Sequence, residues 1–212
     1  MSAEIKQRSK EWFNQRLGRF TASRISELMG VKGLGLTGED YAFQNACEVV
    51  FGKDSEHSFT DFDMQRGVAL EPLAFAKFNE IKMLDFIEAK ESEFFPYGEH
   101  AGASPDGLVG ENAILEIKCP RPNKFFKIVK NGHKAIDKGY IHQMQMQMLC
   151  TNSEQCHFFN YIIFNGKEMW HEIVVNRDES AIELMKERIE MAIELKLKYI
   201  ESLKQSVQFD LL

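Results

Sequence analysis

The spacing of apolar residues predicts that helices dominate the first third of the chain. Apolar positions recur at intervals of three and four over residues 39–51 and 63–83, which is the period of an amphipathic helix. Two shorter helices are predicted before them, the first capped by Ser9 and the second by Thr21. Glycines are frequent in residues 31–38, so this segment is predicted to be a mobile loop.

From Glu93 onward, short apolar runs bounded by turn residues replace the helical period. These runs predict consecutive strands of one meander, at 94–97, 101–109 and 113–118. Helical spacing then returns, and two alternating runs around Asn165 and Gly166 predict a hairpin. The elements expected after the meander are helices at 122–130 and 136–149, hairpin strands at 156–164 and 168–175, and a long amphipathic helix at 179–202.

This order of elements predicts an α/β fold with a central mixed β-sheet flanked by helices. The chain has 212 residues, of which 44% are hydrophobic and 27% charged, so we expect it to fold around one core. No repeat, low-complexity segment or change in composition marks a boundary. Residues 1–212 are therefore expected to form a single domain.

The charge balance limits the kind of partner surface. With 26 basic and 32 acidic residues the net charge is −6, which excludes a uniformly basic nucleic-acid-binding surface but not a local basic patch. Apolar runs are only a few residues long, far below the roughly 20 needed to span a bilayer. The first ten residues are polar, unlike a secretory signal. We expect a cytoplasmic protein without a membrane partner.

The spacing of the cysteines indicates a reducing compartment. The four residues form no CxxC pair and lie at Cys47, Cys119, Cys150 and Cys156. This pattern favours free thiols in the core over zinc, an iron–sulfur cluster or a disulfide framework.

The residues that suggest chemistry lie on two predicted strands joined by a short turn. The sequence SPDG at 104–107 ends one strand, and LEIK at 115–118 lies on the next. Because strand side chains alternate between faces, Glu116 and Lys118 share one face, and the two apolar residues of LEIK point into the core. In a hairpin of this length, Asp106 is expected near Glu116.

Two converging carboxylates repel each other, and proteins tolerate this mainly where a cation lies between them. An all-oxygen site without Cys or His suits Mg²⁺ or Mn²⁺. Lys118 beside such a site can orient a water and stabilise the charge that develops at phosphorus, so the set favours hydrolysis of a phosphodiester. The simpler alternative is a solvated hairpin in which Glu116 and Lys118 form an ordinary surface pair. The combination of SPDG, a short turn and an ExK flanked by apolar residues favours the first interpretation.

Further residues occur in an order that is similar to a known family. They are Trp12, Arg16-Leu17-Gly18, Thr21-Ala22-Ser23, Gly67 with Glu71, the SPDG and LEIK sequences followed by Cys119-Pro120, and Tyr140 with Gln143. The set resembles the lambda exonuclease and YqaJ-like viral recombinase family of PD-(D/E)XK nucleases, whose core is restriction-endonuclease-like. The resemblance spans residues 12–147, and the C-terminal hairpin and helix match in pattern only.

The resemblance implies a metal site with named ligands. Asp106, Glu116 and Glu71 would hold catalytic Mg²⁺, as two ions, together with the main-chain carbonyl of Ile117, and Mn²⁺ could substitute. Lys118 would position the nucleophile.

Two helices are expected to complete this site. Glu71 shares the apolar face of the helix at 63–83, which supports an inward position, although a boundary glutamate is the alternative. Gln143 matches a glutamine that, in the family, contacts the site or the attacking water. Gln145 and Gln147 do not match it and are interpreted as solvated or partner-facing residues. The interleaved methionines are interpreted as core.

Arg16 and Ser23 correspond to residues that bind the 5′ phosphate of the recessed strand in the family. A guanidinium and a hydroxyl near the start of a helix form a reasonable phosphate anchor. The alternatives are a surface salt bridge from Arg16 to Glu11 or Glu27, and a helix-capping role for Ser23.

A basic stripe follows the ExK strand and would contact the DNA backbone. Its members recur every three or four positions and are Arg121, Lys124, Lys127, Lys130 and Lys134. A merely solvated helix face is the alternative. The 31–38 loop, with only Lys32 charged, is shorter and less basic than its family counterpart, and His142 and His171 are expected to be structural.

The resemblance implies an Mg²⁺-dependent exonuclease that digests double-stranded DNA from a 5′ end and leaves 3′ single-stranded overhangs for recombination by strand annealing. It also implies a ring-shaped homotrimer and a single-strand annealing protein as partner, in the cytoplasm of a bacterial host if the source is viral. The alternatives are a structure-specific or restriction-type endonuclease and a catalytically silent DNA-binding module of the same fold. The cysteine positions disfavour an iron–sulfur nuclease.

Overall fold

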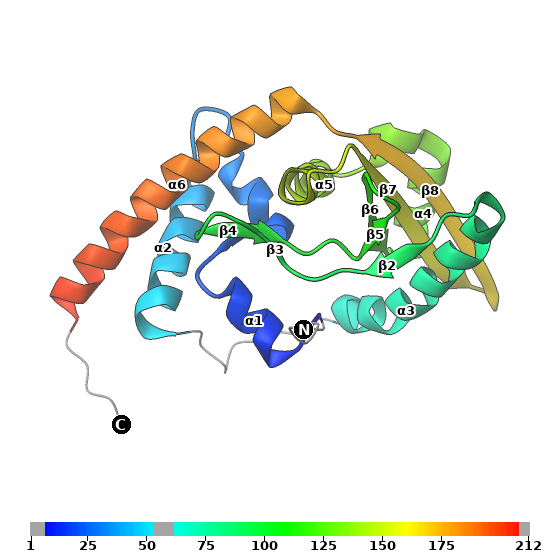
Figure 1. Ribbon diagram of the computed structural model, residues 1–212, viewed down its shortest axis with the longest axis horizontal. Coiled ribbons are helices and arrows are strands. Elements are labelled where there is room, and N and C mark those ends of the chain that lie inside the picture. The colour runs from blue at the N-terminus through cyan, green and yellow to red at the C-terminus, as the bar shows by residue number, and fades with distance from the viewer. Residues whose placement is uncertain (1–6, 53–61, 208–212) are drawn as a thin grey trace.

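The computed structural model describes residues 7–52 and 62–207 and contains two β-sheets that lie side by side (Figure 1). Helix α5 (Lys138–Thr151) packs against strands of both sheets and therefore lies between them. The predicted α/β class, with a mixed sheet flanked by helices, is confirmed. Within the described ranges, no helix combines the length and the apolar character that crossing a membrane requires.

The larger sheet has the strand order β2-β5-β6-β7-β8. Its strands are β2 (Ala89–Glu91), β5 (Gly107–Val109), β6 (Ala113–Lys118), β7 (Gln155–Phe164) and β8 (Lys167–Asn176). Neighbours pair antiparallel except β6 and β7, which are parallel, so the sheet is mixed. The β7–β8 hairpin turns at Asn165 and Gly166 as predicted, with φ values of 51° and 71°.

The smaller sheet has the order β1-β4-β3 and consists of β1 (Phe20–Thr21), β4 (Ala101–Ala103) and β3 (Phe95–Tyr97). The chain leaves this sheet after β4 and enters the larger sheet at β5, so the prediction of one continuous meander is wrong. Pro105 lies at the crossing and has no N–H to donate to a strand ladder, which explains the break. Strands β1 and β2 are too short for the apolar pattern to predict them.

Both faces of β6 are covered by helices. Leu115 and Ile117 pack against α3 (Phe62–Lys82), which confirms their predicted inward orientation. On the opposite face, Ile114 packs against methionines of α5. Glu116 shares that face with Ile114 and therefore points toward α5.

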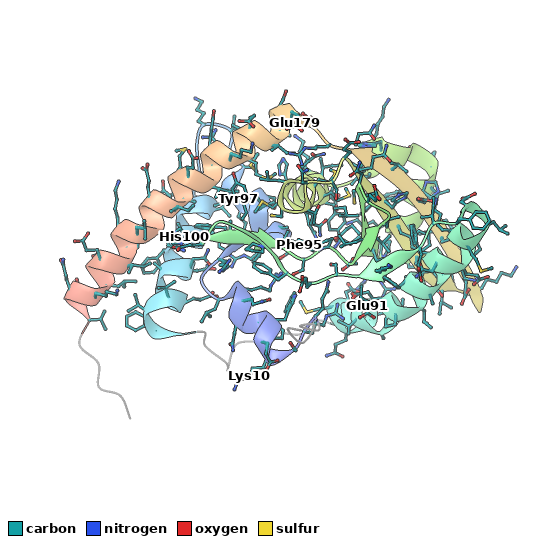
Figure 2. The ribbon with its side chains drawn as sticks, viewed as in Figure 1. Lys10, Glu91, Phe95, Tyr97, His100 and Glu179 are labelled. Atoms are coloured by element: carbon teal, nitrogen blue, oxygen red, sulfur yellow. The ribbon has the colours of Figure 1, made fainter. Side chains whose placement is uncertain are left out.

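The remaining helices frame the two sheets. They are α1 (Lys10–Arg16), the 3₁₀-helix η1 (Ala22–Leu28), α2 (Gly35–Phe51), η2 (Met83–Asp85), α4 (Pro122–Asn131), η3 (Gly132–Ala135) and α6 (Glu179–Ser206). Helices α2 and α6 run side by side and bury the apolar face of the smaller sheet (Figure 1). Figure 2 shows Tyr97 and His100 at the small sheet, beside α6.

Three local predictions can be compared with the helix ends. Ser9 caps α1 as predicted, because its hydroxyl accepts from the N–H of Trp12 at 3.2 Å. Thr21 precedes η1 but makes no capping bond, since its hydroxyl lies 3.4 Å from the Tyr41 hydroxyl instead. The predicted 31–38 loop is too long, because α2 begins at Gly35. A Cβ at Gly38 would lie 3.1 Å from the Glu27 carbonyl oxygen, so this glycine permits close packing rather than mobility.

The prediction of four core cysteines is correct only for Cys156. All four cysteines are free thiols, and the other three are half-buried. They lie at positions that are partly exposed to solvent. The residues around them show no clear helix or strand period, so the sequence alone does not predict this partial exposure.

Candidate active site

The β5–β6 hairpin brings the SPDG and LEIK sequences together. The N–H of Asp106 donates to the carbonyl of Leu115 at 2.9 Å, and the N–H of Ile117 donates to Asp106 Oδ2 at 2.6 Å. Gly107 fits closely here, because a Cβ would lie 3.0 Å from the Phe75 ring and 3.1 Å from the Lys90 carbonyl. The predicted proximity of the two sequences is therefore confirmed.

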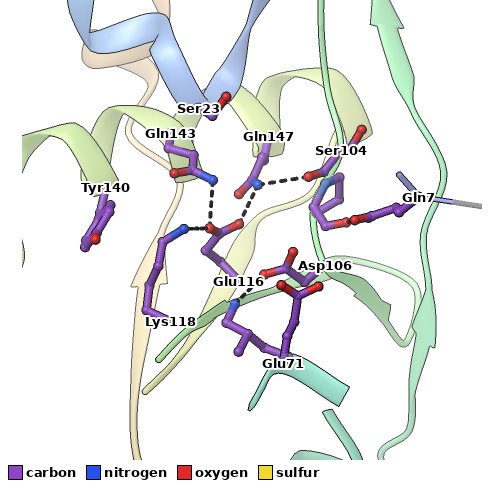
Figure 3. A network of polar contacts seen from close by, with 12 residues as sticks. Gln7, Ser23, Glu71, Ser104, Asp106, Glu116, Lys118, Tyr140, Gln143 and Gln147 are labelled. Atoms are coloured by element: carbon purple, nitrogen blue, oxygen red, sulfur yellow. Dashed lines mark hydrogen bonds and ion pairs between the residues drawn. The ribbon is translucent and has the colours of Figure 1, made fainter. Parts of the chain in front are cut away.

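Glu116 is the buried centre of a hydrogen-bond network (Figure 3). Glu116 is only 1% exposed. Its Oε1 accepts hydrogen bonds from the ammonium of Lys118 and from Gln143 Nε2, the latter at 2.7 Å. Its Oε2 accepts from Gln147 Nε2 at 2.6 Å. A buried carboxylate needs such donors, because an unpaired charge in the interior is strongly destabilising. Glu116 and Lys118 share one face of β6 as predicted.

The electrostatics of the hairpin reflect a concentration of carboxylates. Burial raises the pKa of Asp106 well above its usual value, and the negative charges of Glu116 and Glu71 raise it further. Burial lowers the pKa of Lys118, but the neighbouring carboxylates of Glu116 and Asp106 outweigh burial and leave the pKa raised. Lys118 is therefore a protonated ammonium beside a cluster that favours additional positive charge.

Glu71 reaches the same place from α3. Figure 3 shows its carboxylate next to Asp106. The Glu71 side chain therefore points inward as predicted, but it is not fully buried, because 28% of it remains exposed. The guanidinium of Arg8 forms an ion pair with Glu71 at 2.6 Å, which the sequence did not indicate because the two residues lie 63 positions apart.

The oxygen atoms of the hairpin that could act as metal ligands suit a hard divalent cation. Asp106 Oδ1 has no hydrogen-bond donor among the described residues, and Glu116 Oε2 accepts only one bond. Carboxylate oxygens and the main-chain carbonyl of Ile117 are ligands that Mg²⁺ prefers over sulfur or imidazole. Nowhere in 7–52 or 62–207, however, do three or more His, Cys, Asp or Glu side chains already converge as a metal-binding group.

A cleft of about 1110 Å³ joins this hairpin to α4. Glu71, Ile117 and Lys118 line one part of it, and basic residues of the predicted stripe line another, namely Arg121, Lys124 and Lys127. Asp106 opens onto an adjoining cavity of about 340 Å³, which shares Arg8 and Glu71 with the cleft. The acidic cluster and the basic stripe thus face connected spaces.

The basic stripe is partly neutralised by neighbouring carboxylates. Arg121 pairs with Asp63 at 2.8 Å, and Lys124 pairs with Asp137. For Lys127, the described part of the chain supplies no carboxylate within ion-pair distance, so its charge is available in the cleft.

Arg16 and Ser23, expected to bind a phosphate, are neighbours. The Arg16 guanidinium lies 3.5 Å from the hydroxyls of both Ser23 and Ser104, and it stacks 4.1 Å above the Trp12 ring. Burial lowers the pKa of Arg16 to about 10, so it stays charged at neutral pH. The alternative salt bridge to Glu27 is not formed, because that carboxylate pairs with Arg24.

Ser104 is a further neighbour of Arg16, and the sequence did not single it out for this place. Its hydroxyl accepts from Trp12 Nε1 at 3.0 Å and from Arg16 at 3.5 Å. Ser104 lies two positions before Asp106, so the same short segment borders both the Arg16 side chain and the acidic hairpin. The position of Ser104 within SPDG is the signal that could have indicated this.

The interpretation of Gln145 and Gln147 as solvated residues is wrong. Both are buried, at 2% and 0% exposure. Gln145 donates to the carbonyl of Asn176 and accepts from the N–H of Asp178, so it ties α5 to the start of α6. Gln147 donates to Glu116. Their hydrogen-bond partners lie in segments far away in the sequence, so the apolar period of the helix alone does not predict that these glutamines are buried.

The comparisons with known proteins agree with this geometry. Residues 11–154 match the family model of the YqaJ-like viral recombinase domain. The chain belongs to this family. None of the curated proteins matches the chain.

Solved structures support the same assignment. The alkaline exonuclease LHK-Exo from Laribacter hongkongensis is 30% identical, with a TM-score of 0.80 over 93% of this chain and 97% of that one. Its complex with dAMP matches equally well. A phage-related exonuclease from Haemophilus somnus 129PT, 17% identical, shares the fold with a TM-score of 0.67 over 89% of this chain and 96% of that one. These matches confirm the predicted restriction-endonuclease-like fold of the PD-(D/E)XK type. They also support the prediction that the protein is a DNA exonuclease, which is a hydrolase.

Proposed function

We propose that this YqaJ-like protein is an Mg²⁺-dependent exonuclease that degrades one strand of double-stranded DNA in the 5′-to-3′ direction. The 3′ single-stranded overhangs would serve recombination by strand annealing. One observation carries the proposal: the β5–β6 hairpin joins Asp106 and Glu116 to a protonated Lys118 beside a basic cleft. The match to an alkaline exonuclease supports the reaction class, and the family resemblance supports the polarity.

The metal would be held by oxygen ligands of three elements. Asp106, Glu116 and Glu71, with the main-chain carbonyl of Ile117, are the proposed ligands of two Mg²⁺ ions, for which Mn²⁺ could substitute. Bound Mg²⁺ would polarise the phosphoryl group and lower the pKa of a water molecule. Lys118 stabilises the negative charge that develops as the phosphodiester is attacked. Gln143 holds Glu116 and borders the place of the attacking water.

DNA would be held at two places. Arg121, Lys124 and Lys127 line the cleft and would contact the DNA backbone through their positive charge, without reading the base sequence. At the other place, Arg16 and Ser23 would bind the 5′ phosphate. Arg16 suits this role because it is charged, desolvated and held by hydroxyl groups rather than by a carboxylate.

The assembly is proposed from the resemblance. Residues 1–212 would act as a single nuclease domain within a ring-shaped homotrimer, and a closed ring around a duplex would explain processive digestion. A single-strand annealing protein would be the partner, in the cytoplasm, which would be that of a bacterial host if the source is viral. Light scattering tests the ring, since a trimer has three times the chain mass of 24.5 kDa.

End-labelled duplexes test the proposed function. Linear DNA carrying a label at either end, with and without a 5′ phosphate, is incubated with Mg²⁺ or with a chelator. We expect the 5′ label to be released first, faster from phosphorylated ends, and only with the metal. A covalently closed circle should remain intact. Nicking of the circle would indicate an endonuclease, and no nucleotide release from any substrate would indicate a silent module.

A further inference from the structure

Gln147 lies on α5 one helical turn after Gln143, so the two amides project from the same side of the helix. Both reach Glu116, but each takes a different carboxylate oxygen (Figure 3). Gln143 is half-buried, whereas Gln147 is completely buried. Gln147 therefore cannot contact DNA directly, and any effect on the reaction must pass through the groups that it contacts.

The hydrogen bonds of Glu116 leave one direction open for a cation. A carboxylate offers about four acceptor positions, two on each oxygen. Lys118 and Gln143 take both positions on Oε1, and Gln147 takes one on Oε2 at 2.6 Å. The remaining position on Oε2 is the one available to a metal, and Gln147 is the donor on that oxygen.

The same amide also touches the other motif segment. Gln147 Nε2 lies 3.4 Å from the carbonyl oxygen of Ser104, two residues before Asp106. One NH₂ group thus faces both the segment that carries Asp106 and the side chain of Glu116. It therefore links the backbone of Ser104 to the side chain of Glu116.

The orientation of this amide is maintained despite an unsatisfied atom. Gln147 Oε1 is buried without a hydrogen-bond partner among the described residues, a state that is normally unfavourable. Rotating the amide by half a turn would place that oxygen against the Glu116 carboxylate, where two acceptors would repel each other. The NH₂ group is therefore held toward Glu116.

We propose that Gln147 is a positioning residue that fixes Oε2 of Glu116 for metal binding. The inference rests on the proposed function, because it takes Glu116 as a metal ligand. Partners that hold a ligating carboxylate typically change metal affinity by about 10- to 100-fold when they are removed. Gln147 is expected to act in this range.

The test measures Mn²⁺ binding to the full-length protein without DNA, by titration calorimetry. Gln147→Met has a similar volume but no donor, and we expect it to weaken Mn²⁺ binding at least about tenfold. Gln145→Met is the matched control, because Gln145 is also a buried glutamine of α5 but contacts Asn176 and Asp178 instead. It should lose thermal stability and keep Mn²⁺ affinity within about twofold of the wild type.

A second variant covers the case in which Gln147→Met fails to fold. Gln147→Asn keeps a polar group but is too short to reach Glu116, so it should weaken Mn²⁺ binding in the same way. Wild-type affinity in a folded Gln147 variant would overturn the positioning role, while DNA hydrolysis by the wild type would leave the proposed function intact. A wild-type protein that neither binds Mn²⁺ nor releases nucleotides would overturn both.

Discussion

The main-chain N–H of Ile117 donates to Asp106 Oδ2 at 2.6 Å and ties the carboxylate of one strand to the backbone of the next. Ile117 stands between Glu116 and Lys118, so this bond sets the position of Asp106 relative to both. The same bond leaves Asp106 Oδ1 available to a cation. A short β5–β6 turn is needed for this contact, which explains why SPDG and LEIK lie so close in the sequence.

Lys118→Ala should reduce nucleotide release by about 10³-fold or more, because it removes the ammonium that stabilises charge in the transition state. Binding of duplex DNA should largely persist, since the cleft keeps its other basic residues. Release of nucleotides under single-turnover conditions and DNA binding by fluorescence anisotropy measure the two effects. Lys130→Ala serves as the control, because Lys130 does not line the cleft. A near-normal rate in Lys118→Ala would remove Lys118 from the mechanism.

Arg16→Ala should abolish most of the preference for 5′-phosphorylated ends. The variant removes the guanidinium that lies beside Ser23 and Ser104, and charge-assisted bonds to phosphate are worth more than neutral ones. The measurement is the ratio of initial rates on phosphorylated and 5′-hydroxyl duplexes. The rate on the 5′-hydroxyl duplex should change little and provides the internal control. An unchanged ratio would place the phosphate anchor elsewhere.

Lys127→Ala should weaken DNA binding uniformly across sequences and reduce the slope of log K against log salt by about one unit. Lys127 lines the cleft and has no carboxylate partner in the described ranges, so its charge is available to a phosphate. Lys130→Ala, on the same helix but outside the cleft, should keep the wild-type slope. A wild-type slope in Lys127→Ala would show that Lys127 does not contact the DNA backbone.

Lys196 should make stability depend on pH in the alkaline range. Its Nζ is buried, donates to the Gly18 carbonyl at 2.9 Å and lies 3.0 Å from His100 Nδ1. Burial, and then the charge of Arg19, lower the pKa of Lys196 from 10.5 to about 8. Between these two values the unfolded chain binds more protons than the folded chain, so the free energy of unfolding rises with pH.

Lys196→Met lacks this titrating group. Urea unfolding of wild type and variant between pH 7.5 and 10 should show the wild type gaining relative stability, by at most about 1.4 kcal/mol per pH unit. Burial and then the charge of Lys196 lower the pKa of His100, so the comparison uses pH values from 7.5 upward, where His100 is neutral. A difference that stays constant or falls with rising pH would contradict the lowered pKa.

Features set by local chemistry could be predicted from the sequence. The β7–β8 turn needs two residues with positive φ, and Asn165-Gly166 supplies them. The alternation of LEIK placed Glu116 and Lys118 on one face, and the short turn brought Asp106 to them. These inferences depend on contacts between residues close in sequence, for which backbone periods are a reliable guide.

Features set by distant contacts could not be predicted. Helix α5 is covered by both sheets and by other helices, so its alternating glutamines and methionines show no exposed face. Gln147 is buried because Glu116, 31 positions away, accepts its hydrogen bond. Arg8 pairs with Glu71 across 63 positions. In each case a specific polar partner far away in the sequence, not hydrophobic spacing, decides where the side chain lies.

The most direct measurement is single-turnover nucleotide release from a linear duplex with saturating Mg²⁺, for the wild type, Glu116→Gln and Glu111→Gln. Glu111 is an exposed glutamate in the turn of the same hairpin and provides the matched control. Circular dichroism verifies that each variant is folded. We predict that Glu116→Gln releases nucleotides several orders of magnitude more slowly than Glu111→Gln, which should match the wild type. Equal rates in the two variants would contradict the assignment of this hairpin as the hydrolytic centre.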